Sequence, residues 1–103
     1  MSYILQVDFK MEGPFGNEMV KEFTDLAKSI NDEEGLIWKI WTEDSEAKEA
    51  GGIYLFETKE SAYKYLTMHT ARLKGFGIEK VNGKIFEVNE GLTSINHGPS
   101  KKR

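Results

Sequence analysis

The sequence predicts an α+β domain of the ferredoxin-like kind, in which two helices pack on a four-stranded antiparallel sheet. Two observations lead to this fold class. Strand and helix patterns follow one another in the order β-α-β-β-α-β, and 103 residues are enough for one domain. Right-handed crossovers between the strands place both helices on one face of the sheet. The opposite face is then left without a helix to cover it.

The first strand and the first helix are predicted within residues 3–30. Apolar and polar side chains alternate over residues 3–10, which is the period of a strand with one buried face. Gly13-Pro14-Phe15-Gly16 is typical of a loop, and Asn17 is the expected N-cap of the helix after it. This helix carries one apolar stripe, formed by Met19, Val20, Phe23, Leu26, Ala27 and Ile30.

The second and third strands are predicted over residues 36–43 and 50–57. The second strand is apolar on both faces, with Trp38 on one face and Trp41 on the other. One of these indoles would lie on the open face of the sheet, and large exposed apolar patches mark interfaces. We therefore expect a homodimer in which two sheets pair face to face. The alternative is that one indole is half exposed beside a loop.

The second helix is expected to start after its cap Thr58 and to end at Gly75. Its apolar stripe consists of Ala62, Leu66, His69 and Leu73, with Tyr65 beside it. We expect the last strand from about Lys84 onward, with Ile85, Phe86 and Val88 in it. Asn82-Gly83, just before it, is also a strong hairpin signal.

Composition excludes several classes of protein. The chain has no cysteine, so it forms no disulfide and no thiolate metal site, and its two histidines are too few for a typical zinc centre. With a net charge of −3, we expect no nucleic-acid partner. No apolar run approaches the length of a membrane span and no signal-peptide pattern is present, so we expect a cytoplasmic protein. Residues 1–97 form the predicted domain, and residues 98–103 a loose basic tail.

Five segments together resemble the YdhR-like family of small bacterial proteins, whose monooxygenase label rests on fold. These segments are Gly13-Pro14-Phe15-Gly16, Trp38-Lys39-Ile40-Trp41-Thr42-Glu43, Ala50-Gly51-Gly52-Ile53-Tyr54-Leu55-Phe56, His69-Thr70-Ala71-Arg72-Leu73 and Phe86-Glu87-Val88-Asn89-Glu90. The resemblance implies a dimeric α+β barrel and a monooxygenase that needs no cofactor. Gln6 and Tyr54 depart from the Asn-Trp-His arrangement of the haem-degrading branch of the superfamily.

His69 and Arg72 are the candidate catalytic residues. They lie three positions apart on the second helix and therefore share a face. His69 could take a phenolic proton and Arg72 could hold the anion that forms. The alternative is a hydrogen-bonded histidine at the edge of the core, with an arginine that interacts with the helix dipole.

Aromatic side chains are the candidate substrate-binding residues. Trp38, Trp41 and Tyr54 could form the walls of a pocket for a flat molecule, and Phe15 could close its mouth. The alternative is plain packing for the three rings and a simple turn for the loop of Phe15. The first functional hypothesis is a cofactor-independent monooxygenase acting on a phenol or quinol. The second is a non-enzymatic dimer that binds a small hydrophobic molecule or serves stress tolerance.

Overall fold

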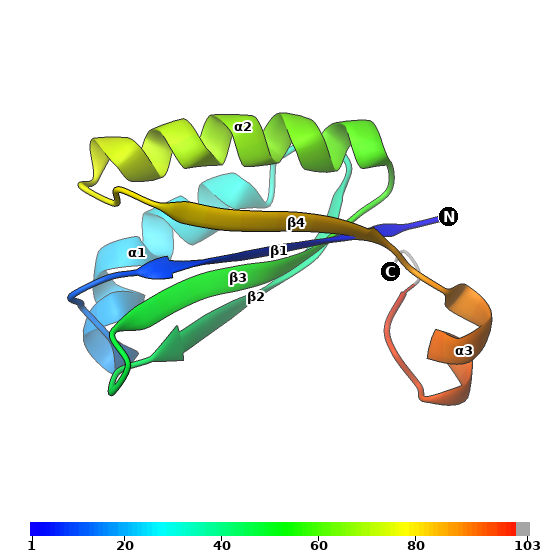
Figure 1. Ribbon diagram of the computed structural model, residues 1–103, viewed down its shortest axis with the longest axis horizontal. Coiled ribbons are helices and arrows are strands. Elements are labelled where there is room, and N and C mark those ends of the chain that lie inside the picture. Colours follow the sequence, from blue (N-terminus) through cyan, green and yellow to red (C-terminus); the bar gives the residue numbers. More distant parts are fainter. Residues whose placement is uncertain (101–103) are drawn as a thin grey trace.

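The computed structural model of the chain describes residues 1–100 (Figure 1). The predicted order β-α-β-β-α-β is confirmed, and one short helix follows it. The elements are β1 (Tyr3–Lys10), α1 (Gly16–Ile30), β2 (Leu36–Asp44), β3 (Glu49–Phe56), α2 (Lys59–Gly75), β4 (Val81–Glu87) and α3 (Glu90–Ile95). Within residues 1–100, no helix combines the length and the apolar character that a membrane crossing requires.

The four strands form one antiparallel sheet in the order β2-β3-β1-β4. In the register of the sheet, Leu5 lies opposite Tyr54 on one side and opposite Ile85 on the other. Side chains of this face meet α1 and α2, so the core lies between the sheet and the two helices. The buried cluster comprises Leu5, Val7, Phe9, Met19, Ile30, Ala50, Tyr54, Phe56, Ala62, Tyr65 and Leu73.

The start of α1 differs from the prediction. The helix begins at Gly16 with Phe15 as N-cap, so the assignment of Asn17 as the cap is wrong. The Gly16 N–H donates to Glu43 Oε1 at 2.8 Å, and this bond ties the first turn to β2. Val20, predicted in the apolar stripe, is 63% exposed, because the helix turns its Met19 face to the sheet.

The α2 helix begins as predicted, with the Ser61 N–H donating to Thr58 Oγ1 at 3.0 Å. Its buried stripe contains Tyr65 in place of Leu66. Leu66 lies over β4, where a Cβ on Gly83 would come within 2.6 Å of its side chain. Gly83 therefore allows the helix to approach the strand, and β4 runs through Asn82-Gly83 without a hairpin. The strand starts at Val81, earlier than the predicted Lys84.

A bulge in β2 sets the faces of its large side chains. Leu36 pairs with Phe56 and Trp38 pairs with Leu55, so Ile37 has no partner of its own in the ladder. The bulge puts Leu36 on the helix-covered face and Trp38 on the opposite, open face. Trp41 lies on the helix-covered face, where its ring stacks on that of Phe23 with centroids 6.3 Å apart.

The chain end covers one end of the open face. The Trp38 Nε1–H donates to the Pro99 carbonyl at 2.8 Å, and the Ser2 hydroxyl donates to the Ser100 carbonyl at 3.1 Å. Leu55, on the same face, is fully buried. Residues 98–100, predicted to be loose, are thus bound to the domain, because the carbonyl groups of Pro99 and Ser100 accept hydrogen bonds from the side chains of Trp38 and Ser2. Figure 1 shows α3 and the N-terminus at the same end of the sheet. The basic residues 101–103 lie outside the described residues.

Candidate functional site

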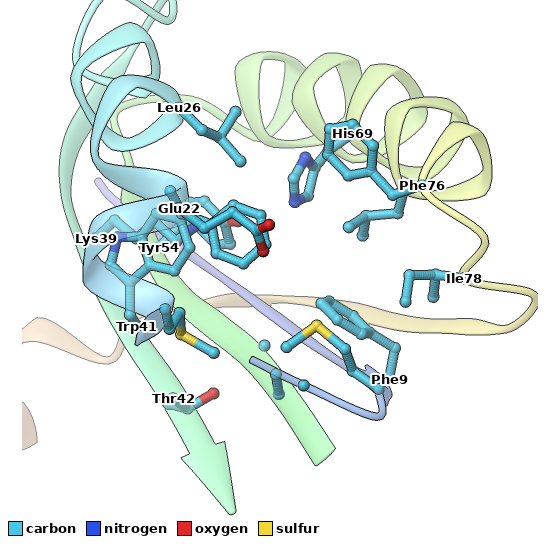
Figure 2. Close-up of a pocket in the computed structure, with 17 residues that line it drawn as sticks. Phe9, Glu22, Leu26, Lys39, Trp41, Thr42, Tyr54, His69, Phe76 and Ile78 are labelled. Atoms are coloured by element: carbon cyan, nitrogen blue, oxygen red, sulfur yellow. The ribbon is translucent and has the colours of Figure 1, made fainter. Parts of the chain in front are cut away.

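A pocket of about 480 Å³ lies between the sheet and the two long helices. Figure 2 shows the imidazole of His69 reaching from α2 toward the rings that line this space. The walls are mainly apolar and aromatic, whereas polar side chains are few: Glu22, Lys39, Thr42, Tyr54 and His69. The apolar walls include Phe9, Met19, Phe23, Leu26, Trp41, Leu73, Phe76 and Ile78. An apolar cavity with a few inward polar groups is the usual form of a small-molecule site.

The register of β2 and β3 positions Lys39. Lys39 lies opposite Tyr54, and Trp41 lies opposite Gly52, so all four share the helix-covered face. A Cβ on Gly52 would come within 2.8 Å of Lys39 Cε and 3.1 Å of the Tyr54 ring. The missing side chain at Gly52 therefore leaves room for the lysine to cross the strand.

The Lys39 ammonium group sits against aromatic faces. Its Nζ lies 3.5 Å from the centroid of the Trp41 ring and 4.7 Å from that of Tyr54. Among residues 1–100, Nζ has no hydrogen-bond or ion-pair partner. The nearest compensation for its charge is thus the π-electron density of the two rings.

Arg72 organises the polar groups of α2 through three hydrogen bonds. Its Nε and Nη2 donate to His69 Nδ1 at 3.2 and 3.0 Å, and Nη2 also donates to the Tyr65 hydroxyl at 3.3 Å. The Tyr65 hydroxyl in turn donates to the Tyr54 hydroxyl at 3.2 Å. Since a guanidinium only donates, His69 Nδ1 is the acceptor, and the neutral ring carries its proton on Nε2.

Burial sets the protonation of these groups. Burial, together with the charges of Lys39 and Arg72, lowers the pKa of His69 to about 3. Burial and the charge of Arg72 lower the pKa of Lys39 to about 7. Burial and the neighbouring Tyr65 raise the pKa of Tyr54. At neutral pH the pocket therefore contains a neutral imidazole, a neutral phenol and an amine that is divided between its two forms.

The pocket brings together some of the predicted site residues and not others. Trp41, Tyr54 and His69 line it, and Arg72 is joined to it through His69. Trp38 lies on the open face of the sheet and does not line the pocket, because the bulge fixes the face of that part of β2. Phe15 packs against the core outside the lining residues, although Gly13 of the same loop belongs to them.

Lys39 was missed by the sequence analysis. The signal was present: Lys39 precedes Trp41 by two positions and therefore shares its face of the strand. The sequence analysis assigned Lys39 no role in the candidate site. Among residues 1–100, no three His, Asp or Glu side chains come together in a group that could hold a metal ion.

Comparisons with known proteins agree with this fold. A solved structure from structural genomics, of the protein YJCS, superposes with a TM-score of 0.60 at 23% sequence identity, and covers 85% of this chain and 98% of that chain. At this identity the likeness supports the fold alone. No curated protein matches the chain. The family model described as "Putative mono-oxygenase ydhR" matches residues 4–99, and the chain therefore belongs to that family.

Proposed function

We propose that this protein is a monooxygenase that oxidises a small phenol or quinol in the pocket without a cofactor. The observation that carries the proposal is the pocket itself, an aromatic-walled space of about 480 Å³ into which only a few polar groups reach. This volume lies within the usual range of small-molecule sites. A flat ring would contact Trp41 and Tyr54, and its oxygen would meet the Nε2–H of His69.

The chemistry needs no electron source beyond the substrate. A phenol and dioxygen give a quinone and water: one oxygen atom enters the ring, and the other takes up the two hydrogens that the ring loses. The pocket would exclude water, orient the ring and stabilise the phenolate that reacts with oxygen. In this role Arg72 acts through His69, because its hydrogen bonds keep the Nε2–H of the imidazole directed away from the guanidinium.

Oxygen consumption tests the proposal. The purified protein is incubated with a panel of phenols and quinols in the absence of added metal, flavin or haem, and oxygen is followed with an electrode. We expect uptake with at least one phenol and none with its methyl ether, which has no acidic proton. Tyr54→Leu should reduce the uptake, whereas Tyr63→Leu, an exposed tyrosine of α2, should not. A panel without any uptake would refute the proposal.

A second candidate is a binding protein without turnover. The observation that favours it is the lowered pKa of His69, which makes this residue a weak base near neutral pH. In that case the same phenols would bind, as followed by quenching of tryptophan fluorescence, but no oxygen would be consumed.

We also propose that the protein is a homodimer that pairs the open faces of two sheets. In the register of the sheet, Ile4 lies opposite Leu55 and Phe86, and Ile40 lies opposite Ile53. Ile40 is 53% and Phe86 is 51% exposed, so this apolar face is uncovered in a single chain. Ile40→Asp should therefore give a monomer in sedimentation, whereas Val20→Asp, at a more exposed site on α1, should leave a dimer. A monomeric wild-type protein would refute the pairing.

A further inference from the structure

We propose that Lys39, and not His69, accepts the phenolic proton of the ligand and then serves as the counter-ion of the phenolate. This inference rests on the proposed function, because it takes the ligand to be a phenol bound in the same pocket. The proton acceptor is then a residue of β2, whereas the sequence had indicated the His69–Arg72 pair of α2. The assignment follows from where the hydrogen bonds place the protons in the pocket.

His69 cannot easily accept a proton from the ligand. Its Nδ1 already accepts from Arg72 Nε and Nη2, at 3.2 and 3.0 Å. Its Nε2 therefore carries the ring proton and can only donate to an oxygen in the pocket. Protonating the ring would also place a second positive charge directly against the guanidinium. The geometry makes His69 a hydrogen-bond donor.

Lys39 has the opposite properties. Its Nζ is part of the pocket lining and has no hydrogen-bond or ion-pair partner among residues 1–100. The depressed pKa of about 7 means that its amine is partly unprotonated at neutral pH and can take a proton. After it does so, the faces of Trp41 and Tyr54 at 3.5 and 4.7 Å stabilise the ammonium.

The charges around the pocket favour an anionic ligand. Burial and the charge of Arg72 lower the pKa of Lys39, and Arg72 has no carboxylate partner among the described residues. The one carboxylate among the lining residues is Glu22 on α1, and its side chain is exposed. The remaining titratable groups around Lys39 are Tyr54 on β3 and Tyr65 and His69 on α2, all neutral at pH 7.

The proton transfer is balanced within the complex. The O–H bond of the phenol breaks, its proton forms a third N–H bond on Lys39 Nζ, and the electron pair stays on the phenolate oxygen. The ammonium and the phenolate then form an ion pair in an apolar space, where each stabilises the charged form of the other. The Nε2–H of His69 donates to the same oxygen.

A coloured phenol tests the assignment without any turnover. The probe is 4-nitrophenol, whose ionised form is yellow and whose neutral form is not, and its absorbance is titrated against pH with protein in excess. We expect the pKa of the bound probe to fall by about one unit or more below that of the free probe, as beside an opposite charge. In Lys39→Met this shift should vanish or reverse. Lys80→Met, which removes an exposed lysine before β4, should behave as wild type.

Several results would overturn the assignment. These are a neutral bound probe in the wild type, an unchanged shift in Lys39→Met, or 4-nitroanisole binding as tightly as 4-nitrophenol. Failure of 4-nitrophenol to bind at millimolar concentration would also count against it. The proposed function can fail on its own. If the bound probe is ionised but no phenol of the panel causes oxygen uptake, the role of Lys39 stands and the monooxygenase activity is refuted. If Lys39→Met consumes oxygen at the wild-type rate, the monooxygenase activity stands and the role of Lys39 is refuted.

Discussion

Replacing Lys39 by methionine should make the protein more stable. Methionine keeps an unbranched stem in the same space and removes the charge. At about 1.4 kcal/mol for each pKa unit, the fall of the pKa from 10.5 to about 7 corresponds to a cost of roughly 4–5 kcal/mol for holding the ammonium in the fold. The loss of the contacts with Trp41 and Tyr54 offsets about half of this gain. We therefore expect the free energy of unfolding to rise by about 2 kcal/mol near pH 6.

The pH dependence of this gain gives the prediction its sign. The pKa of Lys39 is lower in the folded protein than in the unfolded chain, so the unfolded chain binds more protons between pH 7 and 10.5. The wild-type protein gains stability as the pH rises through this range, whereas Lys39→Met does not. The advantage of the variant should therefore be largest below pH 7 and should shrink as the pH rises from 7 toward 10.5.

Urea unfolding followed by circular dichroism, at several pH values from about 6 to 10, measures both effects. Lys80→Met is the matched control, since it removes an exposed charge and should change the stability by only about 0.5 kcal/mol or less. A variant at Lys39 that is less stable than wild type near pH 6 would refute the reasoning. So would a difference in stability that does not change with pH.

Three further predictions concern other parts of the structure. Since burial lowers the pKa of His69 from 6.5 to about 3, the wild-type protein should lose stability as the pH drops through this range, by about 3 kcal/mol at pH 4. His69→Gln should lose much less stability over the same range, as measured by urea unfolding. Gly83→Ala should lower the melting temperature, because its Cβ would meet Leu66 at 2.6 Å, and adding Leu66→Ala should restore part of the loss if this contact is the cause. Deleting residues 98–103 should lower the melting temperature by several degrees, whereas deleting residues 101–103 should not. Equal effects of the two deletions would show that the hydrogen bonds of Pro99 and Ser100 contribute nothing to stability.

The order of the elements could be predicted because each strand and helix has its own period in the sequence. The Thr58 cap and the helix-facing alternation of Leu5, Val7 and Phe9 are local signals of this kind. Errors arose where a tertiary contact decided the outcome. Asn82-Gly83 is a typical turn sequence, yet Gly83 lies within β4, where the side chain of Leu66 occupies the space that a Cβ would fill. No local pattern reports such a contact.

The site was predictable only in part for the same reason. His69, Tyr54 and Trp41 line the pocket, and the sequence indicated them because a histidine within an apolar stripe is unusual and large aromatic side chains cluster on the central strands. The proton arrangement could not be predicted, since it depends on Arg72 folding back onto Nδ1. The face of the sheet on which Trp38 lies could not be predicted either, because the sequence of β2 does not reveal a bulge at Ile37.

The distribution of ion pairs in the fold supports a ligand-binding role for the pocket. The chain carries 17 acidic and 14 basic side chains, so carboxylates are not scarce. The three ion pairs of the described residues are nevertheless at the surface, where each contributes little. Lys39 and Arg72, which lie in the less solvated interior, have no carboxylate there to compensate them. Positive charge without a carboxylate partner lowers the stability of the fold, and replacing Lys39 by an apolar residue would remove much of that cost. Their presence is best accounted for by a negative charge that arrives with the ligand, which is the charge that a phenolate would supply.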